Sequence, residues 1–240
     1  MLLVALVACK PRDVVIQVAI PGPDSVDAPV AKLGLVALPY DRDSLLATFE
    51  AKNPRPAALT QQLDSLFQAY RAPFTTYAVA AYRLQATERR LARERARLDS
   101  LPRGAAAYDT AYRAFAALGD SLTALRAARD DAQRRLARTN DALKPRMDSL
   151  RIEMVRWEDS TYAGYDTLTK KLAEGIGREQ VSDSTDAEGR ARFRLPPGDW
   201  WIYARSWDAW DPNSQWYWNV KVSGERVILD KTTGRRVPRY

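Results

Sequence analysis

The feature that most constrains this chain is a seven-residue repeat of large apolar side chains between Leu59 and about Ile176. The repeat forms two runs, one before and one after a short break at residues 102–104. Their members are Leu63, Tyr70, Tyr77, Leu84, Leu91 and Leu98, then Tyr108, Phe115, Leu122, Leu136, Leu143, Leu150 and Trp157. A heptad repeat is typical of α-helices that pack along a shared seam. We therefore expect two long helices, made antiparallel neighbours by their short connection.

Three kinds of residue interrupt this pattern. Pro73 lies inside the first helix and is expected to kink it, because proline removes a hydrogen bond and clashes with the preceding turn. Arg129 occupies a heptad position, where pairing outward from the tip would place it near the ring of Tyr77. The second helix outruns the first, so we expect it to bend or break, at Pro145 or at Gly164.

Strand-like sequence flanks the helical stretch on both sides. Before it, one strand alternates with period two from Asp13, and a second is expected at residues 32–39. The segment Asp41-Arg42-Asp43-Ser44 is expected to cap a short helix from Leu45 to Lys52. After the helical stretch the period-two pattern returns, with inward-facing Ala191, Phe193, Leu195, Trp200, Ile202 and Ala204. Several short strands separated by turns are typical of a β-sandwich.

Composition removes several classes of activity. The 240 residues contain no His and one Cys, which excludes a Ser-His-Asp triad, an internal disulfide and a cysteine metal cluster. The net charge is +7, but acidic residues are interleaved with the basic ones. Even the densest basic run, Glu88 to Arg97, lacks the aromatic side chains of a nucleic-acid site and is interpreted as a solvated helix face. We expect no nucleic-acid partner and no cofactor.

No constellation of residues indicates catalysis. Asp183, Asp186 and Glu188 are close in sequence, but they lack the spacing of a calcium loop and are interpreted as a turn before a strand. No metal site and no enzymatic activity are expected.

One segment carries a more specific pattern, in the run from Thr185 to Trp200. It reads Thr-Asp-Ala-Glu-Gly, then Arg-Ala-Arg-Phe-Arg-Leu, then Pro-Pro-Gly-Asp-Trp. This run resembles the signature of carboxypeptidase-regulatory-like domains, which are transthyretin-like β-sandwiches. Residues 28–38 look like the first half of such a domain. The resemblance implies a mostly non-catalytic role in folding support, spacing or binding.

The first nine residues resemble the end of a bacterial lipoprotein signal. Leu6, Val7, Ala8 and Cys9 match its cleavage box, which implies that the sulfur of Cys9 is lipidated and anchors the protein to a membrane. Lys10 stands where an inner-membrane retention signal would have Asp, so an outer-membrane lipoprotein facing the periplasm or the cell surface is expected. The alternative interpretation is a buried N-terminal strand with an unreactive thiol.

Six of the seven tryptophans fall between Trp200 and Trp218. Four aromatic residues of this region are candidates for an exposed platform that stacks on sugar rings, namely Trp201, Tyr203, Trp207 and Trp210. The alternative is that these rings cover the junction between the β module and the root of the helices.

These observations predict an α+β chain, in which a transthyretin/Ig-like antiparallel β-sandwich is split by an inserted antiparallel coiled-coil hairpin. The expected parts are a signal remnant (1–9), the two sandwich halves (10–58 and 177–240) and the hairpin (59–176). The predicted function is that of a non-enzymatic envelope lipoprotein, whose projecting hairpin binds a protein partner. Two alternatives stay open: a carbohydrate- or peptidoglycan-binding module using the tryptophan-rich face, and an adaptor-like component of a periplasmic transport system.

Overall fold

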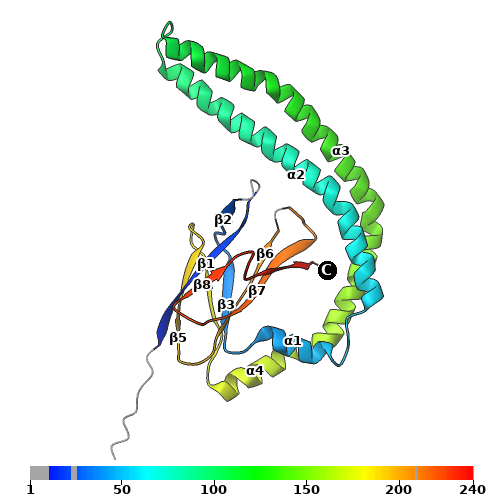
Figure 1. The fold of residues 1–240 in the computed structure, drawn as a ribbon. Helices are drawn as coiled ribbons and strands as arrows, with labels where there is room; N and C mark the ends of the chain where they lie inside the picture. The colour runs from blue at the N-terminus through cyan, green and yellow to red at the C-terminus, as the bar shows by residue number, and fades with distance from the viewer. Residues whose placement is uncertain (1–10, 23–25, 209, 240) are drawn as a thin grey trace, which may run out of the picture. The chain divides into compact units, whose positions relative to one another are not determined.

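The computed structural model describes residues 11–22, 26–208 and 210–239. Its chain is α+β, with a long, bent helical segment and two mainly antiparallel sheets (Figure 1). Two compact units are distinguished: residues 62–150 form one, and the described residues on either side of that range form the other. Each unit is described by itself. Cys9 lies outside the described residues.

The four-stranded sheet is built around β1 (Arg12–Pro21). β1 pairs antiparallel with β2 (Asp27–Pro29) and with β5 (Arg190–Leu195), and parallel with β8 (Arg226–Leu229). The register with β5 sets Val14 opposite Phe193. A strand from the start of the chain is thus hydrogen-bonded to strands that follow the helical segment.

The five-stranded sheet is antiparallel throughout, in the order β4-β3-β6-β7-β9. β3 (Gly34–Leu38) pairs with both β4 (Val181–Ser184) and β6 (Trp201–Trp207). β7 (Ser214–Lys221) then joins β6 to β9 (Arg235–Pro238). In this sheet too, a strand before the helical segment pairs with strands after it.

One hydrophobic core contains side chains from both sheets. The predicted inward alternation is confirmed, because every second residue of β5 and β6 is buried while the residues between them are less buried or exposed. The largest fully buried core side chains are Trp200, Trp218, Phe193, Ile16, Leu35, Leu195, Ile202 and Leu229. Burying one such side chain contributes about 1.5–3 kcal/mol, so this core is the main source of stability in its unit.

Two short helices belong to the same unit as the sheets. α1 (Arg42–Glu50) begins three residues before the predicted start, inside the segment expected to cap it, and the carboxylate of Asp41 accepts a hydrogen bond from the backbone N–H of Asp43 at 3.0 Å. α4 (Tyr165–Ile176) ends at Gly177, whose φ of 67° is the left-handed conformation that glycine adopts without strain.

Two long helices, α2 (Ala57–Ser100) and α3 (Ala106–Tyr162), fill most of the predicted helical stretch. Within residues 62–150 the heptad positions are buried or half-buried, including Leu84 and Leu122 at 8% exposure each, which confirms the period. Glu88 of α2 lies 3.3 Å from Arg126 of α3, so polar contacts flank the apolar ones. In the described part of the chain, no helix has an apolar stretch long enough to cross a bilayer.

Of the two expected interruptions of the second helix, the one at Gly164 is confirmed: α3 continues through Pro145, and the helical stretch breaks before α4, where Gly164 is the N-cap. Two other details differ from expectation. Arg129, expected near the ring of Tyr77, has its Nε 3.1 Å from a carboxylate oxygen of Asp130 on its own helix. The strands β4 and β9 were not foreseen, since both are short and polar and show no apolar alternation.

Candidate functional site

The aromatic residues singled out in the sequence follow one strand rather than forming one platform. Trp201, Tyr203 and Trp207 alternate with the buried residues of β6 and lie on the face of the sheet opposite the core. Trp201 and Trp207 are at the two ends of the strand, about 20 Å apart at a normal strand rise. Trp210 is in the connection between β6 and β7.

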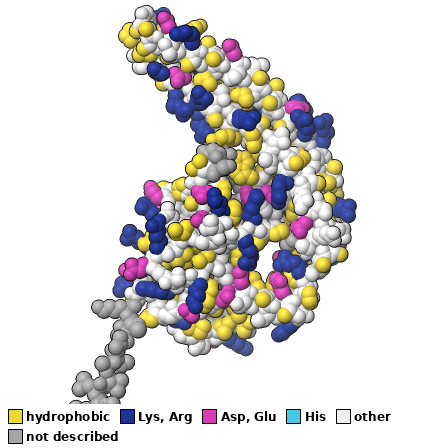
Figure 2. Space-filling model, in the orientation of Figure 1, with side chains coloured by type: hydrophobic (Ala, Val, Ile, Leu, Met, Phe, Trp, Pro, Cys, Tyr) yellow, Lys and Arg dark blue, Asp and Glu magenta, His cyan; other side chains and the backbone are white. Residues whose placement is uncertain are grey.

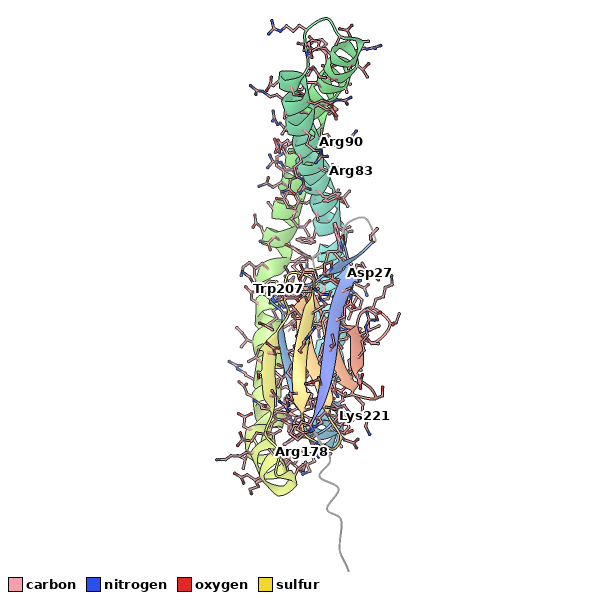
Figure 3. All side chains as sticks on the ribbon, turned by 90° about the vertical axis from the view of Figure 1, so that its left-hand side faces the viewer. Asp27, Arg83, Arg90, Arg178, Trp207 and Lys221 are labelled. Atoms are coloured by element: carbon pink, nitrogen blue, oxygen red, sulfur yellow. The ribbon has the colours of Figure 1, made fainter. Side chains whose placement is uncertain are left out.

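Each end of the strand has its own cation. The ammonium group of Lys221 lies 5.3 Å from the Trp201 ring, and the guanidinium group of Arg239 lies 3.7 Å from the Trp207 ring. Trp207 is 69% exposed, although it is a large aromatic residue. Trp207 and Lys221 lie toward opposite ends of the sheet (Figure 3).

The middle of the strand is covered by helices. The guanidinium group of Arg42, in the first turn of α1, lies 4.7 Å from the Tyr203 ring and 5.9 Å from the Tyr217 ring. It also lies 5.6 Å from the ring of Tyr165 in α4, and its Nη1 donates to the hydroxyl of Tyr217 at 3.1 Å. Arg42 therefore connects α1 and α4 to the outer face of the five-stranded sheet.

Asp43, the next residue of α1, adds an ionic link to the same sheet. Its carboxylate accepts hydrogen bonds from the Tyr217 hydroxyl and, at 3.0 Å, from Arg235 of β9. Burial and the hydrogen bond to Asp43 both raise the pKa of Tyr217, while Arg42 opposes them. Tyr217 therefore stays a neutral hydrogen-bond donor far above neutral pH.

Arg42, Asp43, Tyr165, Tyr217 and Arg235 line a hollow of about 820 Å³, which we call the arginine–tyrosine pocket. Its walls come from α1, α4, the end of α3 and strands β6, β7 and β9. The charged residues in its lining are Arg42, Asp43, Glu50, Arg55, Glu158, Asp166, Arg205, Arg235 and Arg239. A hollow of this size that mixes aromatic rings with charged groups has the dimensions of a small-molecule site.

Burial raises the pKa values of two ionisable groups on the α3 side of the pocket, Glu158 and Tyr162. Burial raises the pKa of Glu158, and nearby Arg55 and Arg205 only partly offset this. Burial and the hydrogen bond that Tyr162 donates to Glu50 raise the pKa of the Tyr162 hydroxyl to about 12.

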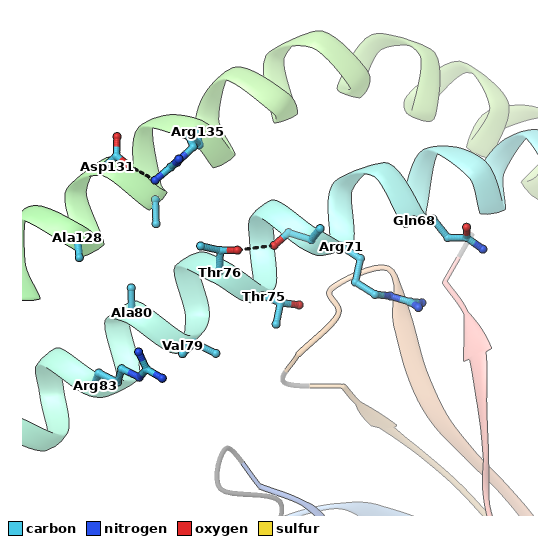
Figure 4. A pocket seen from close by; sticks show the side chains of 12 residues that line it. Gln68, Arg71, Thr75, Thr76, Val79, Ala80, Arg83, Ala128, Asp131 and Arg135 are labelled. Carbon is cyan, nitrogen blue, oxygen red and sulfur yellow. Dashed lines mark hydrogen bonds and ion pairs between the residues drawn. The ribbon is translucent and has the colours of Figure 1, made fainter.

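A second hollow, the helical groove, lies between α2 and α3 and has a volume of about 1020 Å³ (Figure 4). Small side chains make up much of its lining, with arginines among them. The lining residues are Gln68, Arg71, Ala72, Thr75, Thr76, Val79, Ala80, Arg83, Ala128, Asp131, Ala132 and Arg135. Arg135 is paired with Asp131, one turn before it on α3, as Figure 4 shows.

The acidic cluster in the loop before β5 has a structural role. The carboxylate of Asp186 accepts hydrogen bonds from the backbone N–H groups of Glu188 at 3.0 Å and Arg190 at 2.8 Å, which closes the turn. Within the described part of the chain, acidic and cysteine side chains form no group of three suited to a metal ion. On the face shown in Figure 2, Lys and Arg side chains are scattered among Asp and Glu side chains.

Comparisons of the chain with family models, with curated proteins and with solved structures find no match. The sites are therefore interpreted from their own geometry. Sequence reasoning pointed to Tyr203 but missed Arg42, Arg205 and Tyr217. The only available signal was the charged cap sequence at residues 41–44, which gives no indication of the sheet that it contacts.

Proposed function

We propose that this protein is a non-enzymatic lipoprotein of the bacterial envelope, anchored through Cys9, whose helical segment binds a protein partner. The observation that carries this proposal is the helical groove, a hollow of about 1020 Å³ between two helices of 44 and 57 residues. Helices of that length extend about 65–85 Å at the normal rise, far more than is needed to cover a sheet.

The groove favours a partner of definite chemistry. Alanine, threonine and valine side chains line it and would let another helix approach closely, while Arg71, Arg83 and Arg135 add positive charge. Only Asp131 contributes a negative charge to the lining, and it is already paired with Arg135. An amphipathic helix with small apolar residues on one face and acidic residues beside them would complement this surface.

We also propose that the sheets form a transthyretin-like sandwich, split by a helical hairpin. The roles of the residues that carry the resemblance support this. The buried hydroxyl of Thr185 joins two backbone segments, and Asp186 closes the turn. Gly189 has a φ of 72°, and a Cβ there would lie 2.5 Å from the carbonyl oxygen of Val18. The indole N–H of the fully buried Trp200 donates to the carbonyl of Pro196 at 2.8 Å.

The anchor is tested by labelling. Cells producing the protein are fed labelled palmitate, and the wild type is compared with Cys9→Ser. Incorporation in the wild type and none in the variant is expected, together with recovery of the label in the outer-membrane fraction. Unlabelled wild-type protein would contradict the proposed location.

The partner site is tested by crosslinking in cells. A photoreactive residue in place of Thr76, which lines the groove, is expected to give one adduct. Arg83→Glu reverses a charge in the groove, on α2, and is expected to abolish the adduct. Arg113→Glu makes the same charge reversal on α3, outside the groove, and should leave the adduct intact. Equal adduct in both variants would show that the groove does not select the partner.

A second candidate function is binding of glycan, favoured by the 69% exposure of Trp207. An exposed indole is a common surface for stacking on a sugar ring. Retention on peptidoglycan should fall in Trp207→Ala and remain in Trp201→Ala, because the two rings are at opposite ends of β6. Unchanged retention in Trp207→Ala would remove this candidate.

A further inference from the structure

The arginine–tyrosine pocket gathers positive charge around a single aromatic ring. The guanidinium groups of Arg235, Arg205 and Arg42 lie 4.5, 5.6 and 5.9 Å from the centre of the Tyr217 ring. Three like charges within this space repel one another unless anionic groups neutralise them. The ring itself attracts each cation only weakly.

The protein supplies only part of that neutralisation. Arg235 is paired with Asp43, whose carboxylate is 3.0 Å away. For Arg42 and Arg205, by contrast, no carboxylate among the described residues lies within ion-pair distance. Arg42 donates to the Tyr217 hydroxyl, and Arg205 touches the rings of Tyr203 and Tyr217.

Arg205 is the group best placed to meet a ligand. It projects from the outer face of β6, between Tyr203 and Trp207, and its side chain is exposed. Arg42 approaches the same two tyrosine rings from α1, half-buried and held in position by three rings. A fixed guanidinium beside an exposed one is an arrangement that binds oxyanions, because each presents several N–H donors in a plane.

Burial weakens the competition between the carboxylate of Glu158 and an anionic ligand for Arg205. Glu158 lines the pocket and interacts electrostatically with Arg205, but its burial disfavours the charged form. Glu50 is already occupied, since it accepts from Arg55 at 3.3 Å and from the hydroxyl of Tyr162. Burial thus opposes the charge on Glu158, and Glu50 is engaged by Arg55 and Tyr162 rather than by Arg42 or Arg205.

We propose that the arginine–tyrosine pocket binds a small molecule through an oxyanion, a phosphate or a carboxylate group, held by Arg205 and Arg42. The tyrosine rings would flank the rest of the ligand. This inference does not depend on the lipid anchor or on the helical groove, since all the lining residues belong to the unit that contains the sheets.

The test is calorimetric titration of the purified protein at low ionic strength, with inorganic phosphate in one arm and acetate in the other. The arm that saturates identifies the oxyanion. Arg205→Ala is expected to weaken binding about tenfold, the effect of losing one charge-assisted contact. Arg192→Ala, which removes an exposed charge from β5 outside the pocket, should leave affinity unchanged. Glu158→Gln should tighten binding, because it removes the competing carboxylate.

Two results would overturn the inference. One is the lack of saturable binding of either anion to the wild type. The other is equal weakening in Arg205→Ala and Arg192→Ala, which would mean that only net charge matters. Both variants replace exposed residues, so folding is not at risk, and retained tyrosine and tryptophan circular dichroism would verify it.

Discussion

The hydroxyl of Thr185 donates a hydrogen bond to the carbonyl oxygen of Val30 at 2.5 Å, although the two residues are 155 positions apart in the chain. The same hydroxyl accepts from the backbone N–H of Leu33 at 2.8 Å, and Thr185 is only 3% exposed. One side chain thus satisfies two backbone groups from before the helical segment. It ties the start of β3 to the end of β4.

Thr185→Val should therefore destabilise the sheets. Valine has the same shape but leaves the Leu33 N–H and the Val30 carbonyl without a partner, at a cost of about 1–3 kcal/mol in the free energy of unfolding. Urea unfolding followed by tryptophan fluorescence measures the change. Thr185→Ser keeps the hydroxyl and should recover most of the loss. Equal destabilisation by both variants would mean that the methyl group, not the hydrogen bonds, matters here.

The elements of this unit differ in how well the sequence alone predicts them. The strands with strict alternation, such as Ala191, Phe193 and Leu195, were predictable because their apolar faces are buried in one core. A helix cap within residues 41–44 was predictable because the hydrogen bond of Asp41 is local. Strands β4 and β9 were not, since each is stabilised by pairing with a neighbour rather than by its own pattern.

The arginine–tyrosine pocket could not be predicted from the sequence, for a related physical reason. Arg42 and Tyr217 are 175 positions apart and meet only because β6 and β7 pair and α1 covers their outer face. No local spacing encodes that contact. For Arg129 a long-range partner, Tyr77, was expected, whereas its Nε lies 3.1 Å from a carboxylate oxygen of the adjacent residue, Asp130.

Gly189→Ala should be the most damaging small substitution in the turn before β5. The added Cβ would lie 2.5 Å from a backbone oxygen of Val18, and φ at this position is 72°. Strain of this kind costs about 1–3 kcal/mol, so the denaturation midpoint should fall clearly. Gly224→Ala is the matched control, because a Cβ there meets nothing within 4 Å. A similar loss in both variants would refute the steric explanation.

Alkaline titration should separate two classes of tyrosine. Burial raises the pKa values of Tyr162 and Tyr165 to about 12, from an ordinary value of 10.0. Because the folded state holds these protons more tightly, their contribution to stability is complete below pH 10 and is lost between pH 10 and about 12. The ultraviolet absorbance of tyrosinate should show a late phase, and Tyr162→Phe should reduce its amplitude. A single phase at the ordinary pKa would contradict the burial of these hydroxyls.

The ionisation of Asp41 should make the stability of α1 depend on pH in the acid range. Burial alone would raise its pKa, but hydrogen bonds from Ser44, Asn219 and backbone amides outweigh burial and lower the pKa below 3.8. The cap is therefore fully effective above that pH and is lost as pH falls through the lowered pKa. Asp41→Ala should cost about 1 kcal/mol at neutral pH. Asp41→Asn should keep most of the cap while removing its acid dependence, as unfolding curves measured at descending pH would report.

The ionisation of Glu158 should change stability in the opposite sense, because Glu158 is a buried carboxylate whereas Asp41 caps a helix. Its pKa is raised above 4.5 mainly by burial, so the folded state favours the protonated form. The wild type is then expected to lose stability as pH rises from about 4.5 through the raised pKa, relative to Glu158→Gln, which cannot ionise. At neutral pH the variant should be more stable by about 0.5 kcal/mol, because the side chain is only half-buried and solvent screens its charge. The measurement is the difference in unfolding free energy between the two proteins across that pH range. A wild type that is the more stable at neutral pH would mean that Arg55 and Arg205 outweigh burial, and that the pocket already contains its own counter-ion.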